Sequence, residues 1–239
     1  MTASAATLTA SPLLRQFADR DTGALSYLLA CPESRQAIII DPLLEHVPLY
    51  LAVLDELDLK LTHVLDTHIH ADHTTGSAAL RTATGARICL GDCCGADGYD
   101  QALTAGEQLA AGSIALEILH TPGHTPGCLT FRWRDRLFTG DCLLIGGAGG
   151  TDEPGGDPGR LFDSITRNLL PLPDETLVYP GHDTQGRRVS CIGEERRQNP
   201  LFSGISRDEF ISRRAAGGGQ LPVDMKKHLA ANLRCGAPA

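Results

Sequence analysis

A short segment of the sequence, residues 67–73, places three histidines and one aspartate within six positions. It reads Thr-His-Ile-His-Ala-Asp-His and directly follows the apolar run 61–65. Neutral imidazole and ionised carboxylate are natural ligands of Zn²⁺ and Fe²⁺, and a loop at the end of a strand can aim several side chains at one point. A single histidine is more often a hydrogen-bonded core residue, but four donors this close together predict a metal site. The four donors are His68, His70, Asp72 and His73.

Three further segments repeat this arrangement, in which an apolar strand runs into a polar turn. Leu-His-Thr-Pro-Gly-His-Thr-Pro-Gly covers residues 119–127, Phe-Thr-Gly-Asp covers 138–141, and Val-Tyr-Pro-Gly-His covers 178–182. Glycine and proline beside each donor let the backbone turn sharply beneath a bound ion. Each segment alone is a weak signal, but the four in this order favour one shared metal centre. The donors that these three segments add are His124, Asp141 and His182.

The elements that must position these donors alternate between strands and helices. Short apolar runs predict strands, and apolar residues at helical spacing predict helices. Strands that arrive in groups, with helices between and after them, are typical of a mixed α/β layered domain. Residues 216–227 contain three consecutive glycines and predict a loop. The predicted strands are 27–30, 37–40, 61–65, 87–90, 113–119, 128–133, 136–139 and 176–179, and the predicted helices are 47–59, 77–84, 160–169, 191–197 and 207–215.

Length, composition and charge limit the function classes. The 239 residues are 42% hydrophobic, which predicts a single domain over residues 1–239, with 1–12 frayed and 186–239 forming a short C-terminal extension. A net charge of −8 argues against nucleic acid or an anionic membrane as partner. The sequence contains no run of 18 apolar residues and no basic, apolar leader, so we expect a cytoplasmic protein without a membrane segment.

The four donor segments together resemble the metal-binding motifs of the metallo-β-lactamase superfamily, over about residues 25–185. The resemblance implies an αββα four-layer sandwich with the site at one edge of the two sheets. Within that superfamily the chain resembles the persulfide dioxygenases (sulfur dioxygenases) over nearly its whole length. Three stretches carry this second resemblance: the doubled His-Thr-Pro-Gly of 120–127, Glu-Glu-Arg at 194–196 followed by Asn-Pro at 199–200, and Asn-Leu-Arg-Cys-Gly at 232–236.

The second resemblance implies an enzyme of sulfide oxidation that uses one Fe(II) per chain and O₂ to convert glutathione persulfide to sulfite and glutathione. Mapped onto this sequence, the iron ligands are His68, His124 and Asp141. Two histidines and one carboxylate leave up to three positions on iron open for substrate and O₂. We expect no catalytic residue beyond this metal centre. The remaining donors, which would surround these ligands, are His70, Asp72, His73 and His182.

A dinuclear hydrolase is the main alternative. Resemblance to glyoxalase II would imply two ions and attack of a metal-bound hydroxide on a thioester. The stretch that follows residue 182 is short for the helical C-terminal part that glyoxalase II would require. This arrangement would place one ion on His68, His70 and His124, the other on Asp72, His73 and His182, and Asp141 between them.

The eight cysteines offer a third interpretation, a non-catalytic redox module based on the adjacent Cys93 and Cys94. Their spacing does not indicate a disulfide framework, and we expect eight reduced thiols rather than a catalytic nucleophile. Only Cys235, which the resemblance places near the site, is a candidate for a role beyond packing.

Substrate anchoring is where the sequence departs from the family pattern. Many persulfide dioxygenases carry arginines after the aspartate ligand, where this chain has the glycine-rich stretch Gly146 to Gly150. We therefore predict that Arg196 and Arg197 bind the anionic substrate, because a guanidinium can hold a carboxylate through two hydrogen bonds. The pair could instead form ion pairs with nearby acidic residues on a solvated helix. The oligomeric state stays open, with a homodimer as one expectation.

Overall fold

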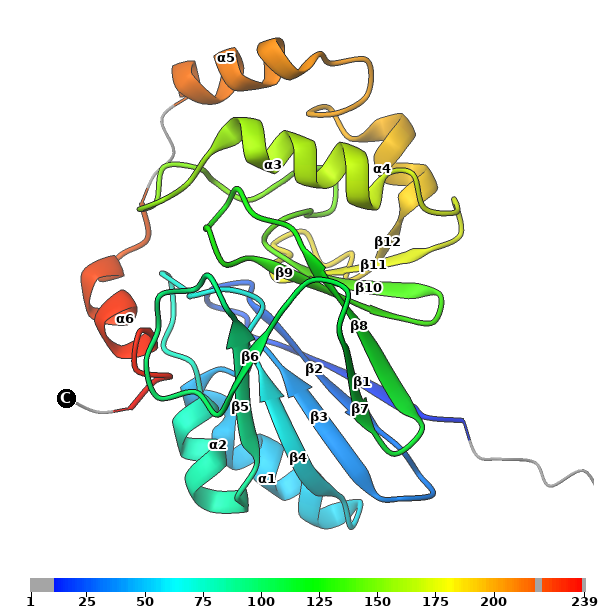
Figure 1. The fold of residues 1–239 in the computed structure, drawn as a ribbon, viewed down its shortest axis with the longest axis vertical. Helices are drawn as coiled ribbons and strands as arrows, with labels where there is room; N and C mark the ends of the chain where they lie inside the picture. The colour runs from blue at the N-terminus through cyan, green and yellow to red at the C-terminus, as the bar shows by residue number, and fades with distance from the viewer. Residues whose placement is uncertain (1–10, 218–220, 238–239) are drawn as a thin grey trace, which may run out of the picture.

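The computed structural model describes residues 11–217 and 221–237, so most of the segment predicted to be frayed lies outside the described residues, as do 218–220 of the predicted loop 216–227. Two β-sheets pack face to face and helices cover both outer faces, which is the αββα sandwich that the resemblance implies (Figure 1). Within the described ranges, no helix is both long and apolar enough to cross a membrane.

The first sheet has the strand order β1-β2-β3-β4-β5-β6, with antiparallel pairs up to β3 and parallel pairs from β3 onwards. Its central strand is an almost continuous apolar run, as expected for a strand covered on both faces. Ile38 and Ile40 face the second sheet, whereas Ile39 faces the helices. The strands are β1 (Leu13–Ala18), β2 (Leu25–Ala30), β3 (Gln36–Ile40), β4 (Lys60–Leu65), β5 (Arg87–Gly91) and β6 (Gln101–Leu103).

The second sheet has the order β12-β11-β10-β9-β8-β7 and is antiparallel except where β10 pairs with β11. Its inner face contributes Leu116, Phe131 and Phe138 to the apolar core between the sheets. The strands are β7 (Gln108–Ala111), β8 (Ile114–His120), β9 (Leu129–Trp133), β10 (Arg136–Gly140), β11 (Leu177–Pro180) and β12 (Ser190–Cys191).

Helices α1 and α2 cover the first sheet, and α3, α4 and α5 lie on the side of the second (Figure 1). Tyr50 and Leu80 pack on the outer face of the first sheet, while Leu161 and Ile192 pack against the second. The α3 helix continues as a π-helical turn over Ile165–Leu169. The helices are α1 (Val47–Glu56), α2 (Ser77–Thr84), α3 (Pro158–Ser164), α4 (Ile192–Gln198), α5 (Arg207–Gly217) and α6 (Met225–Asn232).

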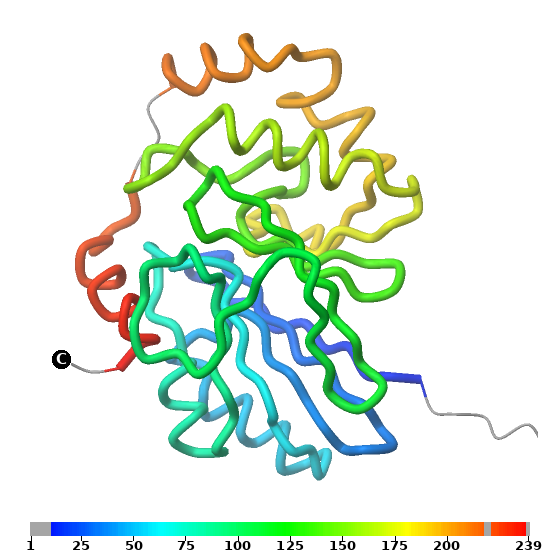
Figure 2. Tube along the Cα trace, viewed as in Figure 1, coloured from blue at the N-terminus to red at the C-terminus, as the bar shows by residue number. Residues whose placement is uncertain are grey.

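Helix α6 was not predicted, because the three consecutive glycines at 217–219 indicate a loop over 216–227, and the helix begins inside that range at Met225. Helix α5 lies on the side of the second sheet, whereas α6 lies on the side of the first, beside the segment that follows β5 (Figure 2). Leu229 and Cys235 pack there against Ile69 and Ile88. The segment from Leu229 to Cys235 thereby contacts the loop that carries the histidine motif.

Candidate metal centre

The histidine and aspartate donors lie where strands end at one edge of the sandwich. His68 follows β4, His124 follows β8, and Asp141 follows β10 directly. One donor atom from each of these three residues lies within 4.8 Å of the other two. His124 Nε2 is 3.9 Å from Asp141 Oδ2, and the His68 and His124 ring centroids are 4.8 Å apart. Two imidazoles and one carboxylate therefore meet at a single point.

Glycine is required at the turns that bring these loops together. Gly140 has φ +50°, and a Cβ there would overlap the side chain of Thr67. Gly123 has φ +140°, and a Cβ there would overlap the backbone of Leu161. Only glycine adopts such angles without strain and also leaves room for the neighbouring chain.

Hydrogen bonds fix the tautomers of both histidines. The Thr67 hydroxyl donates to Asp41 Oδ2 at 2.9 Å, so its oxygen can accept from His68 Nδ1, also at 2.9 Å. His124 Nδ1 donates to the carbonyl of Gly150 at 2.7 Å. With the proton on Nδ1, each ring presents an unprotonated Nε2, which is the form that binds a metal. Burial, and then the neighbouring histidines, lower the pKa of His68 well below its usual value and keep it neutral.

A chain of hydrogen bonds links Asp141 to three of the remaining donors. His182 contacts Asp141 Oδ1 through Nδ1 at 2.7 Å and Asp72 Oδ2 through Nε2 at 2.9 Å. His73 Nδ1 contacts the same Asp72 oxygen at 3.0 Å. Burial alone would lower the pKa of His182, but the two carboxylates outweigh it and raise that pKa well above its usual value. Both nitrogens of His182 are therefore engaged, and Asp141 keeps Oδ2 for the metal.

His70 occupies a different environment, between two buried carboxylates. Its Nε2 lies 3.3 Å from Asp41 Oδ1 and 3.6 Å from Asp66 Oδ1. Asp41, Asp66 and His70 also lie close enough together to hold a cation. Each carboxylate already has its own donors, however: Thr67 for Asp41, and the Thr75 and Ser77 hydroxyls for Asp66. This group supports the histidine loop rather than offering free ligands.

Within the histidine motif, two buried ring nitrogens have no hydrogen-bond partner among the described residues, His70 Nδ1 and His73 Nε2. Donor atoms of His70, Asp72 and His73 also lie within 4.8 Å of one another. Buried polar atoms are nearly always paired, so these two nitrogens mark a place where a second cation would fit. This grouping differs from the dinuclear alternative, which assigns His70 to the ion held by His68 and His124 and places His182 beside Asp72 and His73.

Asn232, the last residue of α6 and not one of the predicted site residues, holds the histidine loop in place. Its side-chain amide donates to the carbonyls of His70 and His73 at 2.8 and 2.7 Å, and its oxygen accepts from the Thr75 N–H at 2.9 Å. Asn232 is only 2% exposed. The motif at 232–236 pointed to this segment. The groups that Asn232 binds lie about 160 positions earlier, and a single sequence does not reveal a contact over that separation.

A cavity of about 570 Å³ opens onto the cluster. Its walls include His124, Asp141 and His182, the loop from Leu144 to Glu153, and the segment from Leu221 to Val223. Hydrogen bonds from the α4 region fix the glycine-rich part of this loop. Glu195 accepts from the Gly146 N–H at 3.0 Å, and Asn199 donates to the Gly147 carbonyl at 3.0 Å. The Glu-Glu-Arg and Asn-Pro motifs thus shape the cavity wall.

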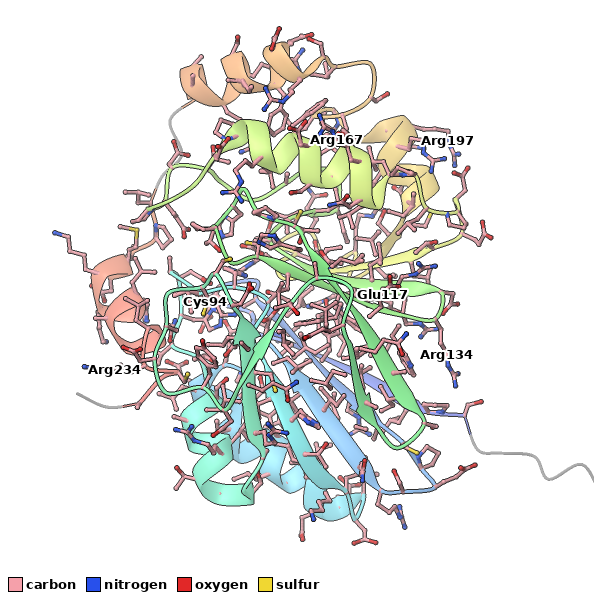
Figure 3. All side chains as sticks on the ribbon, in the orientation of Figure 1. Cys94, Glu117, Arg134, Arg167, Arg197 and Arg234 are labelled. Carbon is pink, nitrogen blue, oxygen red and sulfur yellow. The ribbon has the colours of Figure 1, made fainter. Side chains whose placement is uncertain are left out.

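The structure does not bring Arg196 and Arg197 to this cavity, contrary to the predicted role in substrate binding. Both contact the carboxylate of Asp174, and Arg196 also donates to the carbonyl of Leu172 at 2.7 Å. Arg197 points outwards at the periphery of the molecule (Figure 3). Neither residue is among those that line the cavity. Both arginines do form ion pairs, but with Asp174 on a turn outside helix α4 rather than with acidic residues of their own helix.

All eight cysteines are free of disulfide bonds, and neither Cys128 nor Cys235 is in a reactive form. Burial raises the pKa of the Cys128 and Cys235 thiols to about 12. Cys235 donates to the carbonyl of Asp97 at 3.3 Å and packs behind the histidine loop. Its position and high pKa indicate a packing role.

The chain is similar in sequence to a known protein family and, in sequence and structure, to individual proteins. The family model described as Metallo-beta-lactamase superfamily matches residues 19–92 and 97–182. Mitochondrial persulfide dioxygenase ETHE1 of Homo sapiens is 40% identical over 94% of this chain and 89% of the human protein. The crystal structure of ETHE1 from Myxococcus xanthus has a TM-score of 0.92 and 44% identity, and covers 94% of this chain and 100% of that one.

A hydrolase relative is similar over a shorter stretch. The hydroxyacylglutathione hydrolase of a Polaromonas strain is 42% identical over 164 residues, which are 66% of this chain and 61% of that protein. The likeness to persulfide dioxygenases therefore extends further along the chain than the likeness to this hydrolase.

Proposed function

The chain belongs to the persulfide dioxygenase family of the metallo-β-lactamase superfamily, and we propose that it uses one Fe(II) per chain to oxidise glutathione persulfide with O₂ to sulfite and glutathione. The proposal of a single metal rests on one contrast between the two sets of donors. The donor atoms of His68, His124 and Asp141 converge. His182 and Asp72, which the dinuclear alternative needs as ligands of a second ion, are instead hydrogen-bonded to each other.

The three proposed ligands fit a ferrous ion by their chemistry. Two neutral imidazoles and one carboxylate form the donor set of many non-haem iron oxygenases and leave positions open for substrate. Bound iron would supply the redox chemistry by bringing O₂ and the terminal sulfur of the persulfide together. Overall, the persulfide, one O₂ and one water give glutathione, sulfite and two protons.

The surrounding residues keep the ligands in place and in the right protonation state. His182 holds Asp141 through Oδ1, and Thr67 and the Gly150 carbonyl hold the protons on the Nδ1 atoms of His68 and His124. Outer contacts of this kind set ligand orientation and basicity, and their loss typically costs about 10–100-fold in metal affinity. The loop from Leu144 to Glu153 encloses the cavity in which the substrate would lie.

Thioester hydrolysis by two metals is the second candidate, because of the unpartnered nitrogens His70 Nδ1 and His73 Nε2. It would require His182 and Asp72 to exchange their mutual hydrogen bond for metal coordination. Parallel assays with iron-loaded and zinc-loaded protein separate the two. Glutathione persulfide should give O₂ uptake and sulfite with iron, and a glutathione thioester should not be cleaved. Thioester cleavage without O₂ uptake would favour the hydrolase.

The anionic substrate needs positive charge, and we infer that helix α5 supplies it. Arg213 and Arg214 line a hollow next to the active-site cavity, and the two spaces share Ala148, Gly150 and Asp152 as walls. Arg214 donates to the Ala148 carbonyl at 3.0 Å, and its Nε is buried without a hydrogen-bond partner among the described residues. Arg213 is paired with Glu209, so Arg214, which lines the hollow, is the residue that we propose to hold a substrate carboxylate.

Replacing Arg214 with alanine should raise the KM for glutathione persulfide by roughly 10–100-fold, because a hydrogen bond to a charged group contributes about 1.5–3 kcal/mol and each 1.4 kcal/mol is a factor of ten. Iron content should not change. Arg197→Ala is the matched control and should leave KM as it is, because Arg197 is paired with Asp174 away from the cavity. Steady-state O₂ uptake measures both. A rise in KM for Arg197→Ala but not for Arg214→Ala would mean that Arg197 binds the substrate, as predicted from the sequence, and that Arg214 does not.

The location and assembly of the protein remain predictions. We propose a cytoplasmic location from the sequence alone. The human relative, in contrast, is named as mitochondrial. A homodimer likewise remains an expectation.

A further inference from the structure

A second, smaller cavity of about 150 Å³ lies between the histidine loop and helix α6. Ile69 and Thr125, each the residue directly after a proposed histidine ligand, line one side of it, and Leu229 and Leu233 of the α6 segment line another. Cys94, which lies beside α6, contributes to the wall as well (Figure 3). Leu233 is 41% exposed, so the cavity reaches the surface at this side chain.

The lining of this smaller cavity is mostly apolar, and apart from Glu153 its polar side chains are engaged with their neighbours. The Thr125 hydroxyl contacts Cys128 Sγ at 3.1 Å, and the Cys94 sulfur accepts from the Ala96 N–H at 3.4 Å. A buried water needs about two to four polar partners, so water is poorly held in such a space. An apolar cavity of roughly this volume admits xenon or benzene. The smaller cavity is therefore suited to a small apolar molecule.

Glu153 separates this cavity from the one that opens onto the proposed metal position. Its side chain lines both cavities, and its Oε2 lies 4.0 Å from His124 Nε2. That oxygen is buried and has no hydrogen-bond partner among the described residues, so no such bond opposes a rotation of the side chain. Glu153 is thus a movable partition between an apolar cavity and one lined by charged side chains such as Asp72 and Asp141.

The two substrates of the proposed reaction suit the two cavities differently. Glutathione persulfide carries carboxylates, and an unpaired charge in an apolar space loses its hydration without compensation, whereas O₂ is small and uncharged. We propose that O₂ reaches the metal position through the apolar cavity between Ile69 and Leu229, while the persulfide enters by the larger cavity. Separate entrances let O₂ arrive after the persulfide has filled the larger one. This inference rests on the proposed function, because a hydrolase has no O₂ to admit.

Xenon tests for this cavity without any reaction, because it is apolar and binds in cavities of this kind. Crystals of the iron-loaded protein under xenon pressure should hold xenon between Ile69 and Leu229. Leu229→Trp fills the space with a larger apolar side chain and should remove that xenon. A parent protein that consumes O₂ but holds no xenon at this position would overturn the proposal.

Leu229→Trp should also lower kcat/KM for O₂ by about tenfold, which corresponds to about 1.4 kcal/mol, and leave the iron content and the KM for glutathione persulfide unchanged. Leu229→Ala is the matched variant, because it loses the same packing but widens the cavity, and its kcat/KM for O₂ should equal or exceed that of the parent. If Leu229→Trp does not fold, Leu233→Trp at the exposed rim narrows the same passage and should lower kcat/KM for O₂ in the same way.

Leu49→Trp makes the same substitution at a leucine of α1 that is 47% exposed, and it should alter neither the xenon site nor the kinetics. An equal loss of kcat/KM for O₂ in Leu229→Trp and Leu229→Ala would mean that Leu229 acts through packing, and an unchanged value in Leu229→Trp would mean that O₂ takes another route. Either result contradicts the proposal while the parent protein still consumes O₂. A parent protein that consumes no O₂ would instead contradict the proposed function, and this inference would fail with it.

Discussion

Replacing Asp141 with alanine is expected to abolish persulfide oxidation and to lower the affinity for iron by more than about 100-fold. Among the residues that the structure describes, Asp141 is the carboxylate that joins His68 and His124, so the variant loses both a ligand and the charge that balances the ion. Loss of an outer partner costs about 10–100-fold, and loss of a ligand should exceed that. Competition with a chromogenic chelator measures the affinity, and circular dichroism checks that the fold persists.

His182→Ala and His70→Ala provide the comparison. Both residues surround the proposed ligands without belonging to the set, so each variant should keep most of its iron at saturating Fe(II). His182→Ala should bind iron more weakly, because Asp141 loses a hydrogen bond of 2.7 Å. If both variants lose iron as completely as Asp141→Ala, the ligand set is wrong and the dinuclear arrangement is favoured.

Replacing Asn232 with leucine should reduce the free energy of unfolding by about 3–6 kcal/mol. The side chain satisfies three buried backbone groups, in His70, His73 and Thr75, and each such group left unpaired costs about 1–3 kcal/mol. Leucine has a similar volume and should exclude the water that could replace the amide. The histidine loop should loosen as well, so added iron should raise the stability of this variant less than that of the parent protein. Urea unfolding with and without iron measures both effects.

An exposed asparagine gives the control for this experiment. Asn168→Leu removes a weak 3.4 Å contact with the His120 carbonyl at the surface and should change stability by no more than about 0.5 kcal/mol. A loss below about 1 kcal/mol in Asn232→Leu would mean that α6 does not hold the metal loop.

The proposed ligands could be predicted because each motif is local. His68, His124 and Asp141 all follow apolar strands within turns of glycine and proline, and such turns are readable from a few adjacent residues. The sandwich was predicted through the family resemblance, and the structure and its relatives confirm it. The long apolar strands were predictable too, since burial on both faces leaves an uninterrupted apolar run.

The features that escaped prediction depend on contacts between distant segments. Asn232 contacts the histidine loop across most of the chain. Arg196 and Arg197 follow two glutamates in sequence, yet their carboxylate partner is Asp174 on a neighbouring turn. Charge pairing of this kind is set by tertiary packing, which local spacing does not encode. Strands β1, β6, β7 and β12 were not predicted, and for β6 and β12 the reason is that three or two residues carry too little pattern.

The most direct test of the central claim is an anaerobic titration of metal-free protein with Fe(II), with persulfide-dependent O₂ uptake measured at each step. A single iron held by two histidines and one aspartate predicts that O₂ uptake rises in proportion to added iron and reaches its plateau at one Fe(II) per chain, with sulfite formed in equal amount to the O₂ consumed. Activity that appears only as a second metal ion binds, or a protein that takes up no O₂ at any iron content, would contradict the account.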